Sequence, residues 1–192
     1  MPFDDFESAW VDLPQNDIDT DQIIPARFLK AVDRGTLRDG LFHALRFPDG
    51  VSLDAACPLH APGAREAEIL LAGRNFGCGS SREHAAWALL DWGFRVVVAP
   101  SFGDIFRVNA LKNGLLPVAL PDEALAQLRE CAGAKLRVSL REQRIGPVGG
   151  PGFAFAVDPF ARRCLLEGVD ELGYLLARRP QIEAFAQTRP VE

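Results

Sequence analysis

The chain has 192 residues, of which 48% are hydrophobic, and carries a formal net charge of −5; this length suffices for one domain with a substantial core. A mildly acidic chain without a basic run argues against nucleic acid and anionic membrane surfaces as partners. The acidic start lacks the basic and apolar segments of a signal peptide. No apolar run approaches the roughly 20 residues of a membrane span. We therefore expect a cytoplasmic protein that binds neither nucleic acid nor membrane.

Predicted strands and helices alternate through the centre of the chain. After a strand expected near residues 8–13, short apolar runs predict further strands, and longer periodic segments predict helices. The expected strands are 69–72, 95–99 and 115–120, and the expected helices are 81–92, 102–113 and 121–132. This alternation predicts a parallel sheet with helices packed on it. The pair Asn113-Gly114 is a favoured signal for the end of a helix.

The last third of the chain has a different pattern. Residues 135–145 alternate between apolar and polar, which predicts a half-exposed strand. The glycine-rich segment 149–152 predicts a turn, and 153–157 is expected to return as a hairpin partner. Helical stretches are expected between residues 158 and 187, with a break at Gly168.

The segment 26–49 mixes charged residues, glycines and aromatics without a clear period. Such a composition predicts a mobile loop that contacts substrate. The chain shows no internal repeat, low-complexity segment or linker, so we expect one compact α/β domain over residues 1–192. The cationic residues of this loop are Arg27, Lys30, Arg34 and Arg38.

The most informative local pattern is a glycine-rich loop at 73–83, between a predicted strand and a helix expected to begin at Ser80 or Ser81. Glycines let a ligand approach the backbone closely. The unpaired N–H groups and the positive dipole end of a helix start bind anions. With two hydroxyls and the Arg82 guanidinium beside them, the loop is predicted to hold a carboxylate and to carry out chemistry.

A structural alternative exists for the same residues. Residues 80–83, Ser-Ser-Arg-Glu, fit a capping box, in which a serine and a glutamate satisfy the first turn of the helix. Two adjacent serines allow one to cap and the other to react. An arginine in the first turn opposes the helix dipole, and residues that break a local rule are often functional, which favours the anion site. The Walker and dinucleotide-binding glycine patterns both fail here.

The cysteines and histidines give little support for a metal site in this chain. No C-x-x-C pair occurs, which argues against zinc or iron–sulfur ligation by this chain alone. A nucleophilic role for Cys78 is a minor alternative, because a thiol near a helix N-terminus can have a lowered pKa. The cysteines are Cys57, Cys78, Cys131 and Cys164, and the histidines are His43, His60 and His84.

Several longer segments, in the same order along the chain, resemble those of one enzyme family. They are 19–29, 75–85, 99–106 with Asn109, 114–118 and 160–168. Together they resemble the small-subunit family of 3-isopropylmalate dehydratase, which corresponds to the swivelling fourth domain of aconitase. The resemblance implies a compact swivelling β/β/α domain with a mixed sheet and flanking helices.

The resemblance also implies a reaction and a partner. The family acts as a two-chain hydro-lyase of leucine biosynthesis that interconverts 2-isopropylmalate and 3-isopropylmalate through 2-isopropylmaleate. In the family, the large subunit carries a 4Fe–4S cluster, and the small subunit forms the other wall of the active site. This agrees with the absence of cluster-ligand spacing in the present sequence. A heterodimer with a large subunit is therefore expected.

The family's roles fall on the glycine-rich loop and on one upstream aspartate. Ser80 matches the serine that, as an alkoxide, removes the carbon-bound proton. Arg82 matches an arginine for a substrate carboxylate, and its fork suits bidentate binding. Gly79 and Ser81 are expected beside the substrate. Asp21 resembles the acidic residue that orients neighbouring groups, and an ordinary turn carboxylate is the alternative.

Other assignments stay open at the level of sequence. His84 is expected to be structural or to pair with Asp21 or Glu83. A further substrate arginine cannot be aligned uniquely with any cation of 26–49, and this loop is expected to sense the isopropyl group. Its apolar candidates are Leu29, Val32, Leu37 and Leu41. Alternative functions are the small subunit of a related hydro-lyase for homoaconitate or a methyl-substituted malate, and a non-catalytic anion-binding regulatory module.

Overall fold

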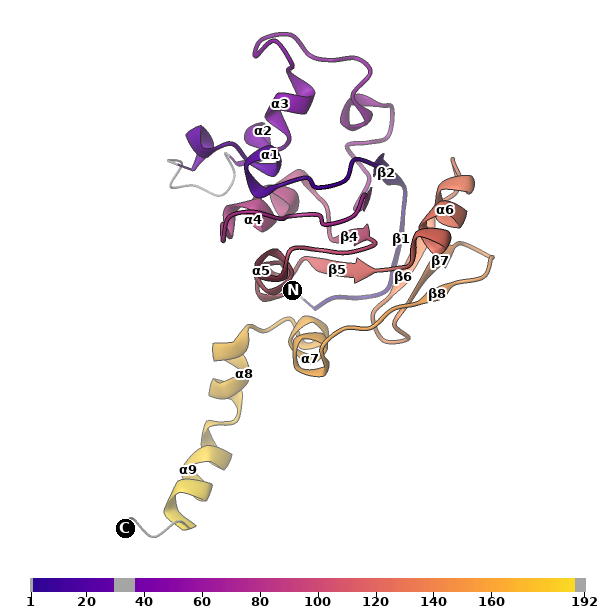
Figure 1. The fold of residues 1–192 in the computed structure, drawn as a ribbon. Helices are drawn as coiled ribbons and strands as arrows, with labels where there is room; N and C mark the ends of the chain where they lie inside the picture. The colour runs from indigo at the N-terminus through magenta and orange to yellow at the C-terminus, as the bar shows by residue number, and fades with distance from the viewer. Residues whose placement is uncertain (1, 30–36, 189–192) are drawn as a thin grey trace.

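The computed structural model describes residues 2–29 and 37–188. These residues form a parallel and an antiparallel sheet, each of four strands. The parallel sheet has the order β2–β3–β4–β5, and it occupies the centre of Figure 1. Its strands are β2 (Trp10–Leu13), β3 (Ile69–Ala72), β4 (Val96–Ala99) and β5 (Leu116–Ala119). Every residue of β3 and β4 is buried, as the unbroken apolar runs predict for parallel strands covered on both faces.

The antiparallel sheet has the order β1–β6–β7–β8. Its strands are β1 (Phe6–Ser8), β6 (Leu136–Ser139), β7 (Arg144–Pro147) and β8 (Phe153–Ala154). The strand expected near 8–13 is confirmed as β2 for residues 10–13, but residue 8 belongs to β1, and the two strands pair in different sheets. At the division, the Ser8 hydroxyl accepts from the amide of Glu68 (2.9 Å). The predicted strand 135–145 similarly becomes two strands joined by a turn.

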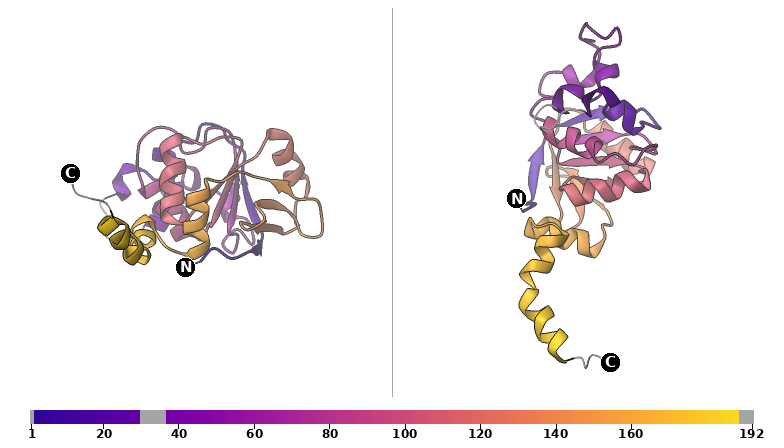
Figure 2. Two further views of the ribbon diagram at one scale, coloured as in Figure 1. Left: turned by 90° about the horizontal axis from the view of Figure 1, so that it is seen from below. Right: turned by 90° about the vertical axis from the view of Figure 1, so that its left-hand side faces the viewer.

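The helices flank the sheets, as Figures 1 and 2 show. The longer ones are α4 (His84–Trp92), α5 (Asp104–Asn113), α6 (Asp122–Glu130), α7 (Pro159–Glu167), α8 (Glu171–Ala177) and α9 (Arg179–Thr188). The short ones are α1 (Thr20–Ile23), η1 (Ala26–Phe28), α2 (Leu37–Gly40), α3 (His43–Arg46) and η3 (Pro58–His60). Helices α8 and α9 project away from the body. Within the described ranges, no helix is long and apolar enough to cross a membrane.

The parallel sheet separates two hydrophobic cores. Leu70 and Val97 face a core shared with α2, α4 and α5, whereas Leu71 and Val98 face a core shared with α6 and the antiparallel sheet. Neighbouring residues take opposite cores because successive side chains of a strand point to opposite faces. The α/β class with flanking helices is thereby confirmed, with the strands divided between two sheets.

The predicted loop 26–49 is partly built into the core. Leu37 and Leu41 are 1% and 0% exposed and pack in the core with α4, so they are not available to a substrate and that expectation is wrong. Arg46 is also buried, and its guanidinium donates to the carbonyls of Asp39 (3.1 Å) and Leu41 (3.0 Å). The candidates Lys30, Val32 and Arg34 lie outside the described residues.

Candidate active site

The glycine-rich loop follows β3 directly, but the helix after it begins later than the sequence predicts. Helix α4 begins at His84, with Glu83 as an N-cap whose side chain makes no capping bond. The expected start at Ser80 or Ser81, and with it the capping box, is therefore wrong. The reason is that the Ser80 and Ser81 carbonyls, which would accept hydrogen bonds within a longer helix, accept from side chains instead. The Thr20 hydroxyl donates to the Ser80 carbonyl (3.3 Å), and the Asn109 side chain donates to the Ser81 carbonyl (3.3 Å).

A capping box does occur in the site, on a different helix. Asp19 caps α1, where its carboxylate accepts from the Gln22 amide (2.7 Å) while the Gln22 side chain accepts from the Asp19 amide (2.9 Å). The two reciprocal bonds satisfy the start of a helix only four residues long. The spacing Asp-x-x-Gln at 19–22 was the signal that could have revealed this cap from sequence.

Three segments meet at the loop, each following one strand of the parallel sheet. The Gly77 amide donates to the Ile18 carbonyl (2.7 Å), and the Thr20 amide donates to the Cys78 carbonyl (3.0 Å). On the other side, Phe76 forms a parallel bridge with Phe102. The segments after β2, β3 and β4 thus stay paired beyond the sheet. Because functional groups of open parallel sheets gather at the carboxyl ends of the strands, this is where a site is expected.

Close packing beneath the loop requires glycine at one position. Gly77 has φ +75°, and a Cβ there would lie 2.3 Å from the ring of Phe106. The buried Phe76 ring packs edge-on against Phe106, with centroids 5.3 Å apart. The loop backbone therefore rests directly on α5, which leaves the residues that follow it at the surface.

Two further non-glycine residues adopt left-handed backbone conformations beside the loop. Asp17 has φ 56° and Asn75 has φ 57°, and the side-chain Nδ2 of Asn75 donates to the Asp17 carboxylate (2.8 Å). Such conformations persist where the surrounding structure determines them and are concentrated at functional sites. The sequence analysis did not identify either residue, although Asn and Asp are the non-glycine types that best tolerate this conformation.

The predicted catalytic and substrate residues lie together on the exposed surface of this loop. Arg82 forms an ion pair with Asp21 of α1, although 61 residues separate them. The Arg82 side chain is 24% exposed and that of Asp21 is 55% exposed. Ser80, Ser81 and Gly79 are all exposed. Within the described part of the chain, no side chain or backbone group hydrogen-bonds either serine hydroxyl.

The backbone of the loop also presents donors. The carbonyls of Ser80 and Ser81 point to Thr20 and Asn109. In a trans peptide the N–H points opposite to the C=O, so the amides of Ser81 and Arg82 point away from those two side chains. Among the described residues neither amide has a hydrogen-bond acceptor. In the part of the chain that the structure describes, the loop thus presents two amides without an acceptor where the sequence predicted the donors of a helix start, and anion binding by them stays a prediction.

Cys78 is poorly suited to be a nucleophile. Partial burial raises the pKa of its thiol, and the nearby carboxylates of Asp19 and Asp17 raise it further. The thiol instead donates to the Asp17 carbonyl (3.6 Å). The minor alternative of an activated thiol gains no support from this environment, because the nearby charges are negative rather than positive.

His84 packs against the indole of Trp87, with ring centroids 4.7 Å apart. In the described ranges it makes no hydrogen bond to Asp21 or to Glu83, and Asp21 pairs with Arg82 instead. The structural interpretation of His84 is the one that these contacts support. No group of three metal-ligand side chains occurs among the described residues.

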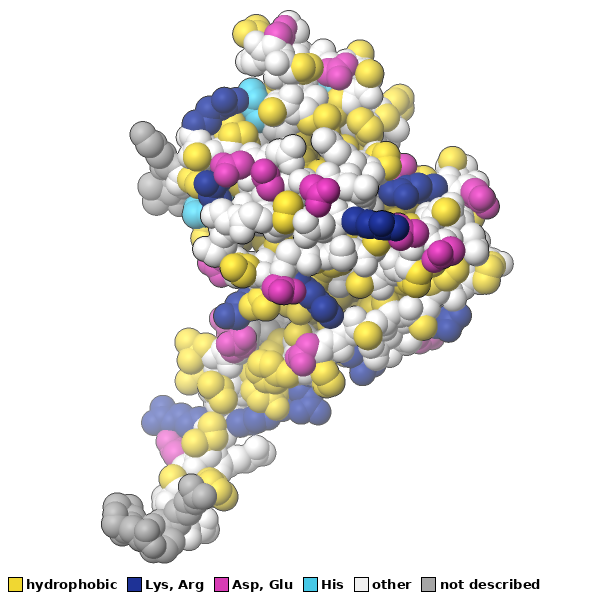
Figure 3. All heavy atoms as spheres, viewed as in Figure 1, with side chains coloured by type: hydrophobic (Ala, Val, Ile, Leu, Met, Phe, Trp, Pro, Cys, Tyr) yellow, Lys and Arg dark blue, Asp and Glu magenta, His cyan; other side chains and the backbone are white. Residues whose placement is uncertain are grey.

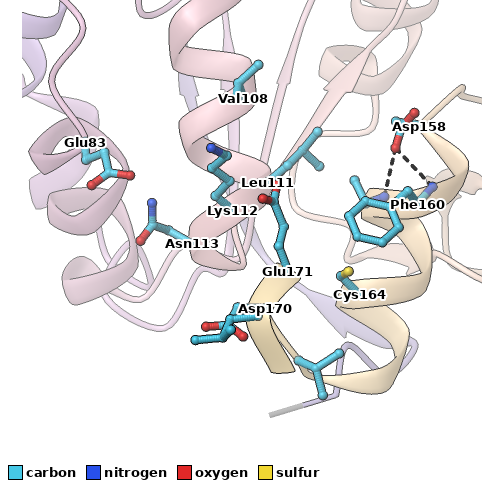
Figure 4. A pocket seen from close by; sticks show the side chains of 13 residues that line it. Glu83, Val108, Leu111, Lys112, Asn113, Asp158, Phe160, Cys164, Asp170 and Glu171 are labelled. Atoms are coloured by element: carbon cyan, nitrogen blue, oxygen red, sulfur yellow. Dashed lines mark hydrogen bonds between the residues drawn. The ribbon is translucent and has the colours of Figure 1, made fainter. Parts of the chain in front are cut away.

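A groove of about 520 Å³ lies next to the loop, between α5, α7 and α8, as Figure 4 shows. Glu83 lines its edge, and its walls are mostly apolar, with Val108, Leu111 and Phe160 among them. Figure 3 shows hydrophobic side chains gathered over α7 and α8. Neither serine, Arg82 nor Asp21 lines this groove, so the hollow and the chemically equipped loop are separate features.

Comparison with known proteins agrees with this geometry. Residues 3–123 match the aconitase C-terminal domain family, which defines the class of protein. A small subunit of 3-isopropylmalate dehydratase from Roseiflexus sp. (strain RS-1) is 50% identical over 184 residues, covering 94% of this chain and 90% of the relative. One from Anaeromyxobacter dehalogenans is 50% identical over 179 residues, covering 93% and 94%.

The fold resembles that of a solved structure from the same family. A crystal structure of 3-isopropylmalate dehydratase from Methanocaldococcus jannaschii superposes with a TM-score of 0.69 at 27% identity, covering 95% of this chain and 99% of that one. The chain belongs to the 3-isopropylmalate dehydratase small-subunit family, within the aconitase superfamily.

Proposed function

We propose that this chain is the proton-transfer half of a two-chain hydro-lyase that isomerises 2-isopropylmalate and 3-isopropylmalate through 2-isopropylmaleate, in the cytoplasm. One observation carries the proposal: Ser80, Ser81 and Arg82 lie together on an exposed loop, with Arg82 held by Asp21. A base, hydrogen-bond donors and a carboxylate-binding cation are what this chemistry requires from one wall of a site.

Ser80 acts as the base in this proposal. Its alkoxide takes the proton from the carbon next to the hydroxyl-bearing carbon, and the C–H electron pair becomes the second bond of the alkene. The hydroxyl leaves the neighbouring carbon and takes a proton from an acid assigned to the other wall of the site, which gives water. On rehydration that acid takes the proton back from water, and Ser80 returns its own proton to carbon. Rehydration with the two positions exchanged gives the isomer. An ordinary serine hydroxyl is a very weak base, so the outward amides of Ser81 and Arg82 are assigned to stabilise the oxyanion.

Arg82 binds one substrate carboxylate, and Asp21 orients the guanidinium. The pair is exposed enough for Arg82 to keep free donors, because one carboxylate does not occupy all five N–H groups of a guanidinium. Ser81 and Gly79 are assigned to the substrate side of the same surface.

The other wall is assigned to the large subunit. The loop is open, since none of the hollows described in this chain is lined by Ser80, Ser81 or Arg82. The 4Fe–4S cluster is assigned to the partner, as the family resemblance implies; among the described residues no group of three or more His, Cys, Asp or Glu side chains could hold a metal ion. When bound there, it supplies a Lewis acid for the departing hydroxyl.

The test combines this chain with a cluster-loaded large subunit without air and follows 2-isopropylmaleate formation from 3-isopropylmalate. Each chain alone is the control. Activity only in the mixture supports the proposal. An assembled but inactive mixture would indicate the substrate of a related hydro-lyase, either homoaconitate or a methyl-substituted malate. Failure to associate would contradict the two-chain assignment.

Ser80→Ala then separates catalysis from a merely structural loop. Because the Ser80 hydroxyl caps no helix, we expect the free energy of unfolding of the variant to lie within about 0.5 kcal/mol of that of the parent, as is usual for surface substitutions. Turnover of the assembled enzyme should fall by orders of magnitude, since the base is lost. A non-catalytic anion-binding module remains the alternative, and near-normal turnover by Ser80→Ala would favour it.

A further inference from the structure

We propose that Asn109 of α5 is a positioning residue that sets the orientation of the Ser81–Arg82 peptide, and that Asn113 and Trp87 keep α5 in the register this requires. The proposal rests on the proposed function and deepens it. It concerns residues that do not themselves reach the substrate surface.

The first observation is the contact of Asn109 with the loop. Its side-chain N–H donates to the Ser81 carbonyl (3.3 Å) across 28 residues of sequence. Asn109 is half-buried, whereas Ser81 is exposed. The bond therefore attaches an exposed, irregular peptide to a regular helix. Since the carbonyl points at Asn109, the Arg82 amide of the same planar peptide points to the opposite side.

The second observation is a tie between α4 and α5 one turn further along. The Trp87 indole N–H donates to the side-chain oxygen of Asn113 (2.7 Å), and the Asn113 side-chain N–H donates to the Asn109 carbonyl (2.8 Å). Figure 4 shows Asn113 projecting from α5 towards the helix that follows Glu83.

Helix geometry joins the two observations. Asn109 and Asn113 are four residues apart, so they share one face of α5. From that face, one side chain reaches Ser81, before α4 begins, and the other reaches Trp87, inside α4. The loop and the first turn of α4 are thus clamped to α5 at two points. A slip of α5 along α4 would break the Trp87 bond and withdraw Asn109 from Ser81.

The consequence for chemistry follows from the position of Ser80. Its side chain precedes the clamped peptide by one residue, so rotation of that peptide moves the Arg82 amide relative to the Ser80 oxygen. Loss of a direct oxyanion donor costs about 10²–10³-fold in kcat. Loss of the residue that aims such a donor should cost less, on the order of tenfold.

The test uses the assembled two-chain enzyme and the variants Asn109→Asp and Trp87→Phe. Asn109→Asp keeps the shape and replaces the donor with an acceptor that faces the Ser81 carbonyl. We expect it to lower kcat about tenfold with little change in KM and in affinity for the large subunit. Trp87→Phe keeps an aromatic side chain but removes the N–H together with the five-membered ring, so the bond to Asn113 is lost. A smaller loss of kcat, about threefold, is expected. Gln127→Glu, an exposed amide on α6, is the charge-matched control.

The pH dependence distinguishes positioning from stability. With the Arg82 amide displaced, the alkoxide of Ser80 is less stabilised, and the acid limb of the kcat profile should move to higher pH in Asn109→Asp. A purely structural role would lower the amount of folded enzyme without moving that limb. A parental kcat and pH profile in Asn109→Asp, or a loss that only follows the folded fraction, overturns the proposal.

A second measurement does not depend on turnover. Hydrogen exchange is followed in the isolated chain at the amides of residues 85–87, which donate to the carbonyls of Arg82 and Glu83 where the loop joins α4. It should be faster in Asn109→Asp than in the parent and unchanged in Gln127→Glu. If the parent enzyme fails to turn over 3-isopropylmalate, the proposed function fails while this measurement still decides whether Asn109 clamps the loop. Unchanged exchange in Asn109→Asp contradicts the clamp itself.

Discussion

At the scale of single residues, the ion pair between Arg82 and Asp21 explains how a loop far from α1 in sequence acquires a defined cation. The pair is partly exposed, and exposed pairs contribute only about 0–1 kcal/mol to stability. The pair therefore contributes little to the stability of the fold, which is consistent with the proposal that Asp21 orients the guanidinium. A substitution of Arg82 can therefore change substrate binding while it leaves the free energy of unfolding nearly unchanged.

Arg82→Lys keeps the charge and loses the planar fork that binds a carboxylate through two hydrogen bonds. We expect KM for 3-isopropylmalate to rise at least tenfold in the assembled enzyme, with the free energy of unfolding changed by less than about 1 kcal/mol. Steady-state kinetics and urea unfolding measure the two effects. An unchanged KM would remove Arg82 from the substrate site.

Cys78 provides a prediction about pH. Because burial and the carboxylates of Asp19 and Asp17 raise the pKa of its thiol, less of it is thiolate at a given pH than in a free cysteine. Alkylation of Cys78 by iodoacetamide at about pH 8.5, the ordinary thiol pKa, should be slower than that of a model thiol, with the difference shrinking as pH rises. Mass spectrometry of the modified peptide follows the rate, and Cys78→Ser should remain active. Rapid alkylation near neutral pH would restore the nucleophile alternative.

At the scale of elements, the loop depends on how closely its backbone approaches α5. Gly77→Ala combines a positive φ with a Cβ 2.3 Å from the Phe106 ring, so we expect a loss of about 1–3 kcal/mol in the free energy of unfolding. Gly50→Ala is the matched control, because Gly50 has φ +81° with no atom within 4 Å of its added Cβ. Urea unfolding of both variants gives the comparison, and equal losses would show that backbone conformation alone accounts for the effect.

At the scale of the whole molecule, the C-terminal helices are set apart from both cores. Helices α8 and α9 contain no buried residue, and they project from the body in Figure 2. Their apolar side chains are exposed, among them Leu172 at 61% and Phe185 at 63%.

Ending the chain at residue 170 should therefore cost no more than about 1.5 kcal/mol in the free energy of unfolding. It removes no buried residue, and the edge-on pair of Tyr174 with Phe160 that it breaks is a kind of contact that contributes about 0.5–1.5 kcal/mol. Chemical unfolding monitored by tryptophan fluorescence is suitable, since the three tryptophans of the chain precede residue 170. A larger loss would show that α8 contributes to packing through the groove beside α5.

The sequence by itself determined the α/β class and the central strands and helices, whereas the reactive role of the glycine-rich loop stays a prediction. Unbroken apolar runs such as 69–72 and the Asn113-Gly114 signal are local properties, and the structure confirms both, with Gly114 as the C-cap of α5. The family was also identified from the sequence, because several long segments that match in the same order along the chain are specific to one family. The single-domain organisation over 1–192 stays a prediction.

Only the tertiary structure decided the start of α4, the division of 8–13 into two strands and the pairing of Arg82 with Asp21. Each depends on a partner distant in sequence: Thr20 and Asn109 take the carbonyls that would have extended α4. Likewise β1 and β2 separate because β6 and β3 are their partners. Local patterns report what a segment prefers alone, whereas hydrogen bonds across tens of residues select which preference is realised.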